Sequence, residues 1–147
     1  MENLPLASIQ IGEKVSFSKT VGETDVYMFA GITGDFAPNH INEEYMRKTS
    51  YGKRMAHGVL SIGFASTAAT MMVDKIRASN LGAVSYGYDR IRFVRPIFLG
   101  DTVTVEYTIA EIDHENAKTT AKIEVFNQNN ELCTVGQHIL KFIKMDS

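Results

Sequence analysis

The feature that most constrains the fold is a long stretch without a formal charge, MAHGVLSIGFASTAATMMV, at residues 55–73. As a helix it would measure about 25 Å, which is ample for a central core element. His57, Ser66 and Thr70 interrupt the apolar residues, so a membrane span is disfavoured. A helix that is apolar on nearly all sides in a soluble chain is surrounded by protein. We therefore expect these residues to form the central helix of the fold.

Alternating apolar and polar residues predict strands on both sides of this helix. Before it, residues 14–21 alternate around Val15 and Phe17. After it come four segments rich in β-branched and aromatic residues, at 85–94, 102–112, 118–127 and 132–143. Short links between such strands predict an antiparallel meander of about four strands. An antiparallel sheet can bury its inner face only by wrapping the apolar helix. The predicted fold class is therefore α+β, a hot-dog fold in which a curled sheet surrounds a long helix.

The composition limits the classes of function. A chain of 147 residues fits one domain, which we place over residues 1–147. A formal net charge of -2 offers no electrostatic basis for nonspecific nucleic-acid binding. The only cysteine, Cys133, cannot form an internal disulfide, which favours a reducing compartment. Because the N-terminal sequence has no secretion signal, a cytoplasmic location is the default expectation.

Capping signals predict two short helices between the first strand and the central helix. Thr24 is the candidate N-cap of the first helix, and Gly34 is placed to end it in a left-handed conformation. Asn42 is the candidate cap of the second helix. Asp35 is therefore expected just past the C-terminus of the first helix.

The stretch GDFAPNH at residues 34–40 places Asp35 and His40 five residues apart, with Pro38 between them. Proline disfavours continued helix, so we expect a bent loop. A carboxylate and an imidazole held a few ångströms apart can share one water and move protons in both directions. Alternatively, Asp35 caps a local turn and His40 is an ordinary packing residue. The residues alone leave both interpretations open.

The central helix is expected to begin at the pair His57-Gly58. The first N–H groups of a helix lack internal partners, and a glycine lets a ligand approach the backbone closely. An N–H aimed into a dry pocket could stabilise a developing oxyanion. The alternative is that Gly58 only relieves crowding between helix and loop, and we interpret His57 as structural. An acid–base pair beside an oxyanion site would suit the addition of water to an activated double bond.

Three runs of this sequence, FAGITGDFAPNHINEEY, RMAHGVLSIGFAS and FVRPIFLGDTV, resemble the MaoC-like hydratases, in particular the (R)-specific enoyl-CoA hydratases. The resemblance covers the chain from about Val15 to Phe142. It implies that Asp35 and His40 bind and activate the water and that the Gly58 N–H holds the thioester oxygen. Syn addition to a trans-2-enoyl thioester would then give the (R)-3-hydroxyacyl product. Ser66 matches a family serine that hydrogen-bonds near the catalytic pair, so the resemblance gives it a supporting role beside Asp35, His40 and Gly58.

The resemblance also implies the partners. We expect an acyl-CoA thioester as substrate, a role in fatty acid metabolism, no cofactor and no metal, and a homodimer with its active sites at the interface. The basic residues Lys53, Arg54 and Arg90 would suit CoA phosphates or an acidic carrier protein, so a 3-hydroxyacyl-[acyl-carrier-protein] dehydratase is an alternative. Two further alternatives are a thioesterase of the same fold and a non-catalytic acyl-thioester binding subunit.

The sequence departs from the family pattern at one position of the loop. The family commonly has asparagine directly before the proline, whereas this chain has Ala37 there and Asn39 after the proline. The loop must therefore be anchored differently, and Asn39 is the candidate substitute.

Overall fold

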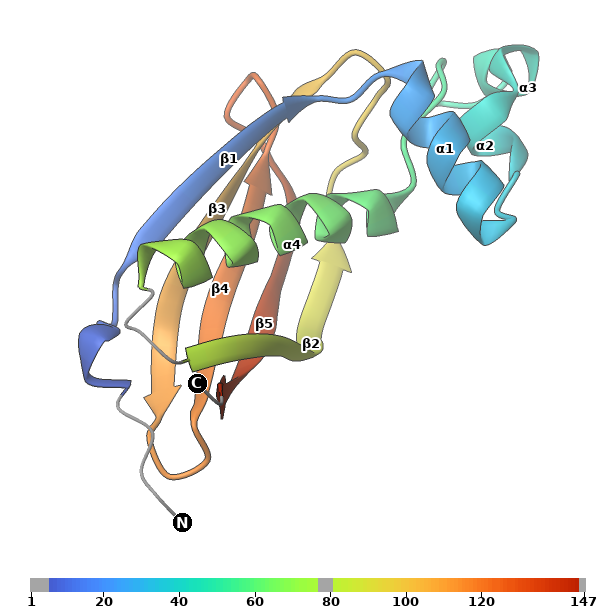
Figure 1. Ribbon diagram of the computed structural model, residues 1–147. Coiled ribbons are helices and arrows are strands. Elements are labelled where there is room, and N and C mark those ends of the chain that lie inside the picture. Colours follow the sequence, from blue (N-terminus) through green and yellow to red (C-terminus); the bar gives the residue numbers. More distant parts are fainter. Residues whose placement is uncertain (1–5, 77–80, 146–147) are drawn as a thin grey trace.

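The computed structural model describes residues 6–76 and 81–145 of the chain. They form one five-stranded antiparallel sheet with the strand order β1-β3-β4-β5-β2, and the helix α4 lies across its concave face (Figure 1). The predicted α+β hot-dog arrangement is confirmed. The elements are a short 3-10 helix (Leu6–Ser8), β1 (Lys14–Thr20), α1 (Glu23–Thr33), α2 (Pro38–Ile41), α3 (Glu43–Arg47), α4 (Gly58–Lys75), β2 (Leu81–Phe93), β3 (Thr102–Asp113), β4 (Lys118–Phe126) and β5 (Leu132–Lys144).

The core lies between α4 and the inner face of the sheet. On β4, and on β3 as far as Ile109, every second residue is buried, as the alternation predicted. The buried face of α4 includes three alanines, whose small side chains let the helix approach the sheet closely. Full burial of a large apolar side chain stabilises the fold by about 1.5–3 kcal/mol. The buried residues of these elements include Val103, Val105, Tyr107, Ile109, Ala121, Ile123, Val125, Phe64, Ala65, Ala68, Ala69 and Met72.

The predicted four-strand meander is wrong in one respect. β3, β4 and β5 are consecutive neighbours, but β2 pairs with β5 at the far edge of the sheet. The segment 94–101 therefore links strands that are not adjacent in the sheet, and β1 takes the place beside β3. Alternation along a strand reports which side chains are buried, but it carries no information about which strand lies beside it.

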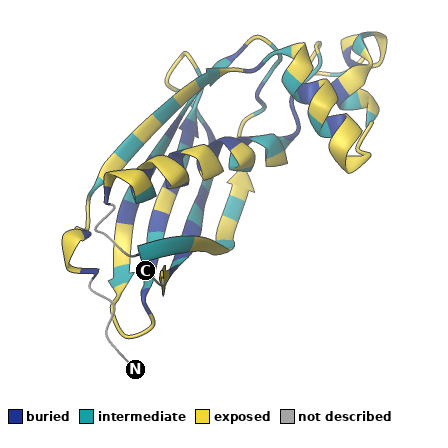
Figure 2. Ribbon diagram, viewed as in Figure 1, coloured by how far each residue is buried: buried dark blue, intermediate teal, exposed yellow. Residues whose placement is uncertain are grey.

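The helix α4 is not enclosed on all sides, which corrects a second expectation. The sheet covers one face, whereas Val59 is 57% exposed and Thr67 and Met71 are also exposed on the other (Figure 2). The described residues of a single chain therefore leave one side of the central helix open. No helix of the described residues is both long and apolar enough to cross a membrane.

The helix α1 starts and ends on glycines. Its N-cap is Gly22 and not Thr24, because the Asp25 carboxylate accepts a hydrogen bond of 2.8 Å from the Gly22 N–H. Gly34 ends the helix with a φ of 83°, in the predicted left-handed conformation. Asp35 follows directly, as expected.

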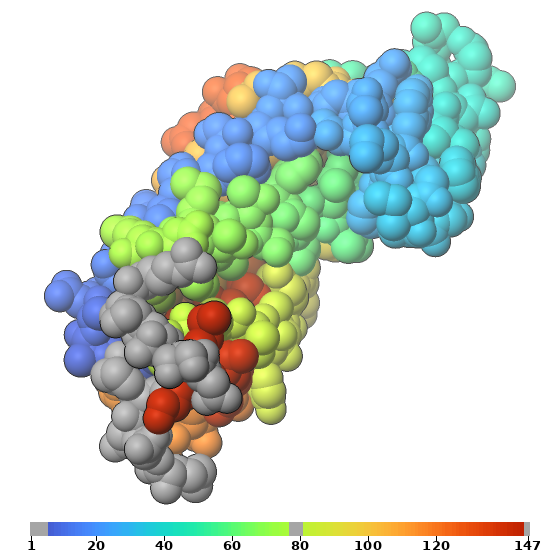
Figure 3. All heavy atoms as spheres, viewed as in Figure 1, coloured from blue at the N-terminus to red at the C-terminus, as the bar shows by residue number. Residues whose placement is uncertain are grey.

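The segment after Asp35 is more regular than the predicted bent loop. Residues 38–41 form the short helix α2, with Pro38 at its first position. Proline is tolerated there because the first N–H groups of a helix have no internal acceptor. Asn42 then caps α3 as predicted, accepting a hydrogen bond of 2.9 Å from the Tyr45 N–H. Together α1, α2 and α3 protrude from one end of the molecule (Figure 3).

Candidate active site

Asp35 lies at the junction between α1 and α2. One carboxylate oxygen accepts a hydrogen bond of 3.2 Å from the Ala37 N–H, so Asp35 does cap its local turn. This contact anchors the loop at the position where the family commonly has asparagine. The Asn39 carbonyl contributes a second anchor, because it accepts a hydrogen bond of 3.1 Å from the Met55 N–H. The Asp35 side chain is 51% exposed, and its second carboxylate oxygen lies 3.9 Å from His57 Nε2.

His40 is buried in α2, and its ring orientation is fixed. Its Nδ1 lies 2.7 Å from the carbonyl oxygen of Met55. A carbonyl only accepts hydrogen bonds, so Nδ1 carries the proton and Nε2 keeps the lone pair in the neutral ring. Burial lowers the pKa of His40 below its ordinary value, which favours that neutral ring at neutral pH. The side chain is therefore prepared to accept a proton at Nε2.

His57 holds Asp35 and His40 together. Its Nε2–H donates a hydrogen bond of 2.9 Å to the backbone carbonyl of Asp35. Its ring stacks on the His40 ring at a centroid distance of 3.7 Å and contacts the Phe29 ring at 4.5 Å. The other nitrogen, Nδ1, is buried and has no hydrogen-bond partner among the described residues. These contacts are consistent with the structural role expected for His57, but they place it inside the site.

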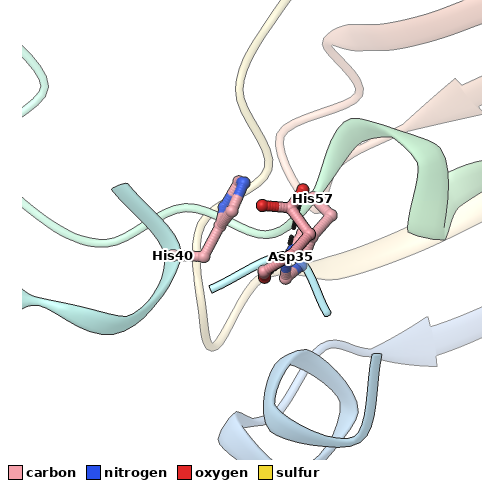
Figure 4. A group of neighbouring side chains, drawn as sticks. All are labelled: Asp35, His40 and His57. Carbon is pink, nitrogen blue, oxygen red and sulfur yellow. Dashed lines mark hydrogen bonds and ion pairs between the residues drawn. The ribbon is translucent and has the colours of Figure 1, made fainter. Parts of the chain in front are cut away.

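The three side chains form one compact group (Figure 4). One nitrogen of each histidine and one carboxylate oxygen of Asp35 lie within 4.8 Å of one another. A water molecule that makes two hydrogen bonds of ordinary length spans roughly 4.5 Å between its partners. Because the two rings are stacked with an interplanar angle of 28°, their in-plane lone pairs do not point at a common centre. The geometry therefore suits a shared water better than a shared metal ion.

Gly58 begins α4 beside a cavity of about 360 Å³ that His40 also lines. No other described residue accepts a hydrogen bond from its N–H. A Cβ at this position would lie 2.8 Å from the Phe93 ring, so any larger residue would force that ring to shift. The crowding explanation for Gly58 thus holds, and it leaves the helix N-terminus free for a ligand. Asp35 itself does not line this cavity.

Ser61 and Thr134 fix the start of α4, and pattern reading missed both. The buried Ser61 hydroxyl donates to the Gly58 carbonyl at 2.7 Å and lies 2.9 Å from the Thr134 hydroxyl on β5. Thr134 also lines the cavity beside Gly58. A buried hydroxyl on an apolar helix was the available signal, but its partner on β5 is remote in sequence.

Ser66 does not join the Asp35–His40 group within one chain. It lies eight residues after Gly58 on α4, about 12 Å along the helix axis. It is exposed there and lines a different cavity with Ser85 and His138. Its supporting role in catalysis stays a prediction.

Arg54, one of the basic residues expected to attract an anion, is already paired. Its guanidinium contacts Glu23 at 2.5 Å and Glu43 at 2.9 Å. Lys53 instead lies over the Phe98 ring, with 4.4 Å between its Nζ and the ring centroid. The ion pairs of Arg54 join residues from separate helices, which the sequence pattern could not reveal.

Comparison with known proteins places this geometry in a family. Residues 7–131 match the model of the MaoC like domain. An (R)-specific enoyl-CoA hydratase of Rhodospirillum rubrum is 38% identical over 76% of this chain and 74% of its own length. A 3-hydroxybutyryl-CoA dehydratase of Methylorubrum extorquens is 33% identical over 75% of this chain and 66% of its own length.

The same family appears among solved structures. An (R)-hydratase from A. caviae, described as involved in PHA biosynthesis, superimposes with a TM-score of 0.78 at 26% identity. The superposition covers 91% of this chain and 97% of that one. With the family model spanning most of the sequence, the chain belongs to the MaoC-like family.

Proposed function

We propose that this protein is a hydro-lyase that adds water to a trans-2-enoyl-CoA and forms the (R)-3-hydroxyacyl-CoA, in a reversible reaction. The observation that carries the proposal is the convergence of Asp35 and neutral His40 within 4.8 Å, next to the start of α4. The relatives named as hydratase and dehydratase support the same class of reaction.

The proposed mechanism divides the proton transfers between the two side chains. A water bound between Asp35 and Nε2 of His40 attacks C3 of the enoyl thioester, and one residue of the pair takes its proton. The electron pair of the double bond moves to give an enolate-like thioester, whose oxygen accepts a hydrogen bond from the Gly58 N–H. The pair then delivers a proton to C2 on the same face, and the reverse sequence dehydrates the product.

A dehydratase acting on 3-hydroxyacyl groups bound to acyl-carrier protein is the second candidate, because it would use the same groups in reverse. The relative from M. extorquens is named a dehydratase, and its name specifies a CoA substrate. CoA and carrier-protein substrates share the same reacting atoms. The choice between them therefore depends on how the protein recognises the carrier.

We also propose that two copies form the working unit. β2 is an edge strand with Val84, Tyr86 and Phe93 at least 46% exposed, whereas β1 at the other edge is a polar strand. An open apolar edge is a liability that pairing with a second copy removes. A second copy would also cover the open face of α4 and exclude water from the site.

The test is the loss of enoyl absorbance when purified protein is mixed with crotonyl-CoA, extended over longer enoyl chains and carrier-bound substrates. Wild-type turnover with chirally pure (R) product is expected. Absence of turnover with every CoA and carrier thioester would contradict the proposal and favour a non-catalytic binding subunit. Sedimentation of the same sample measures whether the active species is a dimer.

A further inference from the structure

Arg54 joins three segments around the site through a single guanidinium group. Its Nε lies 2.9 Å from Glu43 at the start of α3, and Nη2 lies 2.5 Å from Glu23 at the start of α1. Nη1 donates a hydrogen bond of 2.5 Å to the Tyr27 hydroxyl, also on α1. The Arg54 side chain is only 17% exposed. We call this group of four residues the Arg54 clamp.

The first arm of the clamp brackets the hydrogen bond that orients His40. Arg54 directly precedes Met55, whose carbonyl accepts from His40 Nδ1. Glu43 lies three residues after His40. The ion pair between Arg54 and Glu43, reinforced by a backbone contact of 3.4 Å from the Arg54 N–H, therefore fixes both flanks of the His40–Met55 hydrogen bond.

The second arm fixes the helix that carries Asp35. Glu23 and Tyr27 lie in the first half of α1, and Asp35 follows the last residues of that helix. Because a helix behaves as a nearly rigid element, holding one end constrains where its other end delivers a side chain. The same guanidinium thus fixes the positions of both Asp35 and His40 relative to the segment that leads into α4.

The positive charge of Arg54 is neutralised by the carboxylates of Glu23 and Glu43. Its hydrogen bonds lower the pKa of Glu23 and Glu43, so both carboxylates remain ionised and hold the guanidinium between them. A cation that already has two carboxylates and a hydroxyl has little left to offer a phosphate. This removes the basis for the expectation that Arg54 attracts CoA or a carrier protein.

We infer that Arg54 is a positioning residue that sets the distance between Asp35 and His40, and that it is not a substrate-phosphate ligand. The inference rests on the proposed hydratase function. If the inference holds, replacing Arg54 slows the chemical step and has little effect on the affinity for the CoA moiety.

The test compares Arg54→Met with wild type on two substrates, crotonyl-CoA and the crotonyl thioester of pantetheine, which lacks the CoA phosphates. Displacement of a catalytic group by about 1 Å can lower the rate about 100-fold, so kcat is expected to fall by about that factor. KM for crotonyl-CoA should change by no more than about threefold, and the loss in kcat should be equal on both substrates. Arg54→Lys should recover only part of kcat, because an ammonium cannot reproduce the planar fork.

Arg47→Met is the matched control. Arg47 forms an ion pair with Glu44, both side chains are mostly exposed, and this pair stays within the helix α3. The kcat of the Arg47→Met variant is expected to stay at the wild-type value. Glu43→Gln is a milder second variant, expected to lower kcat less than Arg54→Met while retaining the fold.

Two results would overturn the inference. One is a rise in KM confined to crotonyl-CoA, with the pantetheine thioester turned over at the wild-type rate, which would identify a phosphate contact. The other is unchanged kcat in folded Arg54→Met. Since wild type is assayed alongside, an inactive wild type would instead refute the proposed function.

Discussion

Two groups of buried histidines in this molecule use the same side chain in different ways. In the first, at the start of α4, His40 and His57 lie with Asp35. In the second, on β5, His138 accepts or donates at both ring nitrogens, 2.9 Å from the Tyr107 hydroxyl and 2.8 Å from the Ser85 hydroxyl. Its ring also stacks on Tyr88 at 4.3 Å.

The two groups differ in how much of their hydrogen-bonding capacity is left unused. Both nitrogens of His138 are occupied, and burial lowers the pKa of this residue to about 4, so it stays neutral and inert. His40 uses one nitrogen, His57 has a buried nitrogen without a partner in the described part of the chain, and Asp35 is half exposed. A buried imidazole alone therefore does not indicate chemistry. Free hydrogen-bonding capacity next to a cavity does.

The largest expected effect sharpens this contrast on the catalytic side. His40→Gln removes the proton acceptor, so kcat for crotonyl-CoA hydration should fall about 1,000-fold. The melting temperature should remain close to the wild-type value. The matched variant in the second group, His138→Gln, should keep kcat per folded molecule within about threefold. Equal activity losses in both variants would erase the distinction between the two groups.

The second effect concerns the pH dependence of the free energy of unfolding, and it measures the contribution of His138. Its pKa is about 4 in the folded protein and near 6.5 when unfolded, so the unfolded chain binds the extra proton first as pH falls. The stabilising contribution is thus complete above the unfolded pKa and is lost as pH falls toward 4. Between about pH 7.5 and about pH 4.5, wild type should lose roughly 2 kcal/mol more unfolding free energy than His138→Gln.

Denaturant unfolding at the two pH values measures that loss. His40 contributes in the same direction, because burial also lowers its pKa. His138→Gln and His40→Gln should therefore each flatten the pH dependence, with the larger change in the first. Identical slopes for wild type and His138→Gln would contradict the role of His138 as a buried neutral residue.

A smaller effect tests the close packing at the start of α4. Gly58→Ala places a methyl group 2.8 Å from the Phe93 ring and should destabilise the protein by about 2 kcal/mol. Phe93→Ala in the same chain relieves the clash, so the double variant should be more stable than the sum of the two single effects. Thermal unfolding of the four proteins gives the coupling. Additive effects would show that the ring does not restrict this position.

The sequence predicted features that depend on local patterns. The burial of Val103 and Val105 followed from strict alternation, and the capping roles of Gly34 and Asn42 followed from residue type. The bent loop expected at Pro38 is instead a short helix, because proline breaks a helix in its interior but is favoured at its first position. Local patterns succeed where one residue and its near neighbours decide the conformation.

The features that the sequence did not reveal depend on partners that are distant in the chain. The pairing of β2 with β5, the clamp around Arg54 and the hydrogen bonds of His138 all join segments far apart in sequence. Arg54 was expected to suit an anion because it belongs to a local group of basic residues, and its two carboxylate partners lie on separate helices. The convergence of Asp35 and His40 followed from the residues only as one of two interpretations, and the fold decides that they meet.

The most direct test of the account is Asp35→Asn assayed for crotonyl-CoA hydration with chiral analysis of the product. Asparagine keeps an oxygen for the Ala37 N–H, so the loop should retain its conformation while the side chain loses its capacity to carry a proton. If Asp35 carries a proton in the reaction, kcat should fall at least about 100-fold below wild type, with unchanged melting temperature. A folded Asp35→Asn that hydrates crotonyl-CoA at the wild-type rate would contradict it.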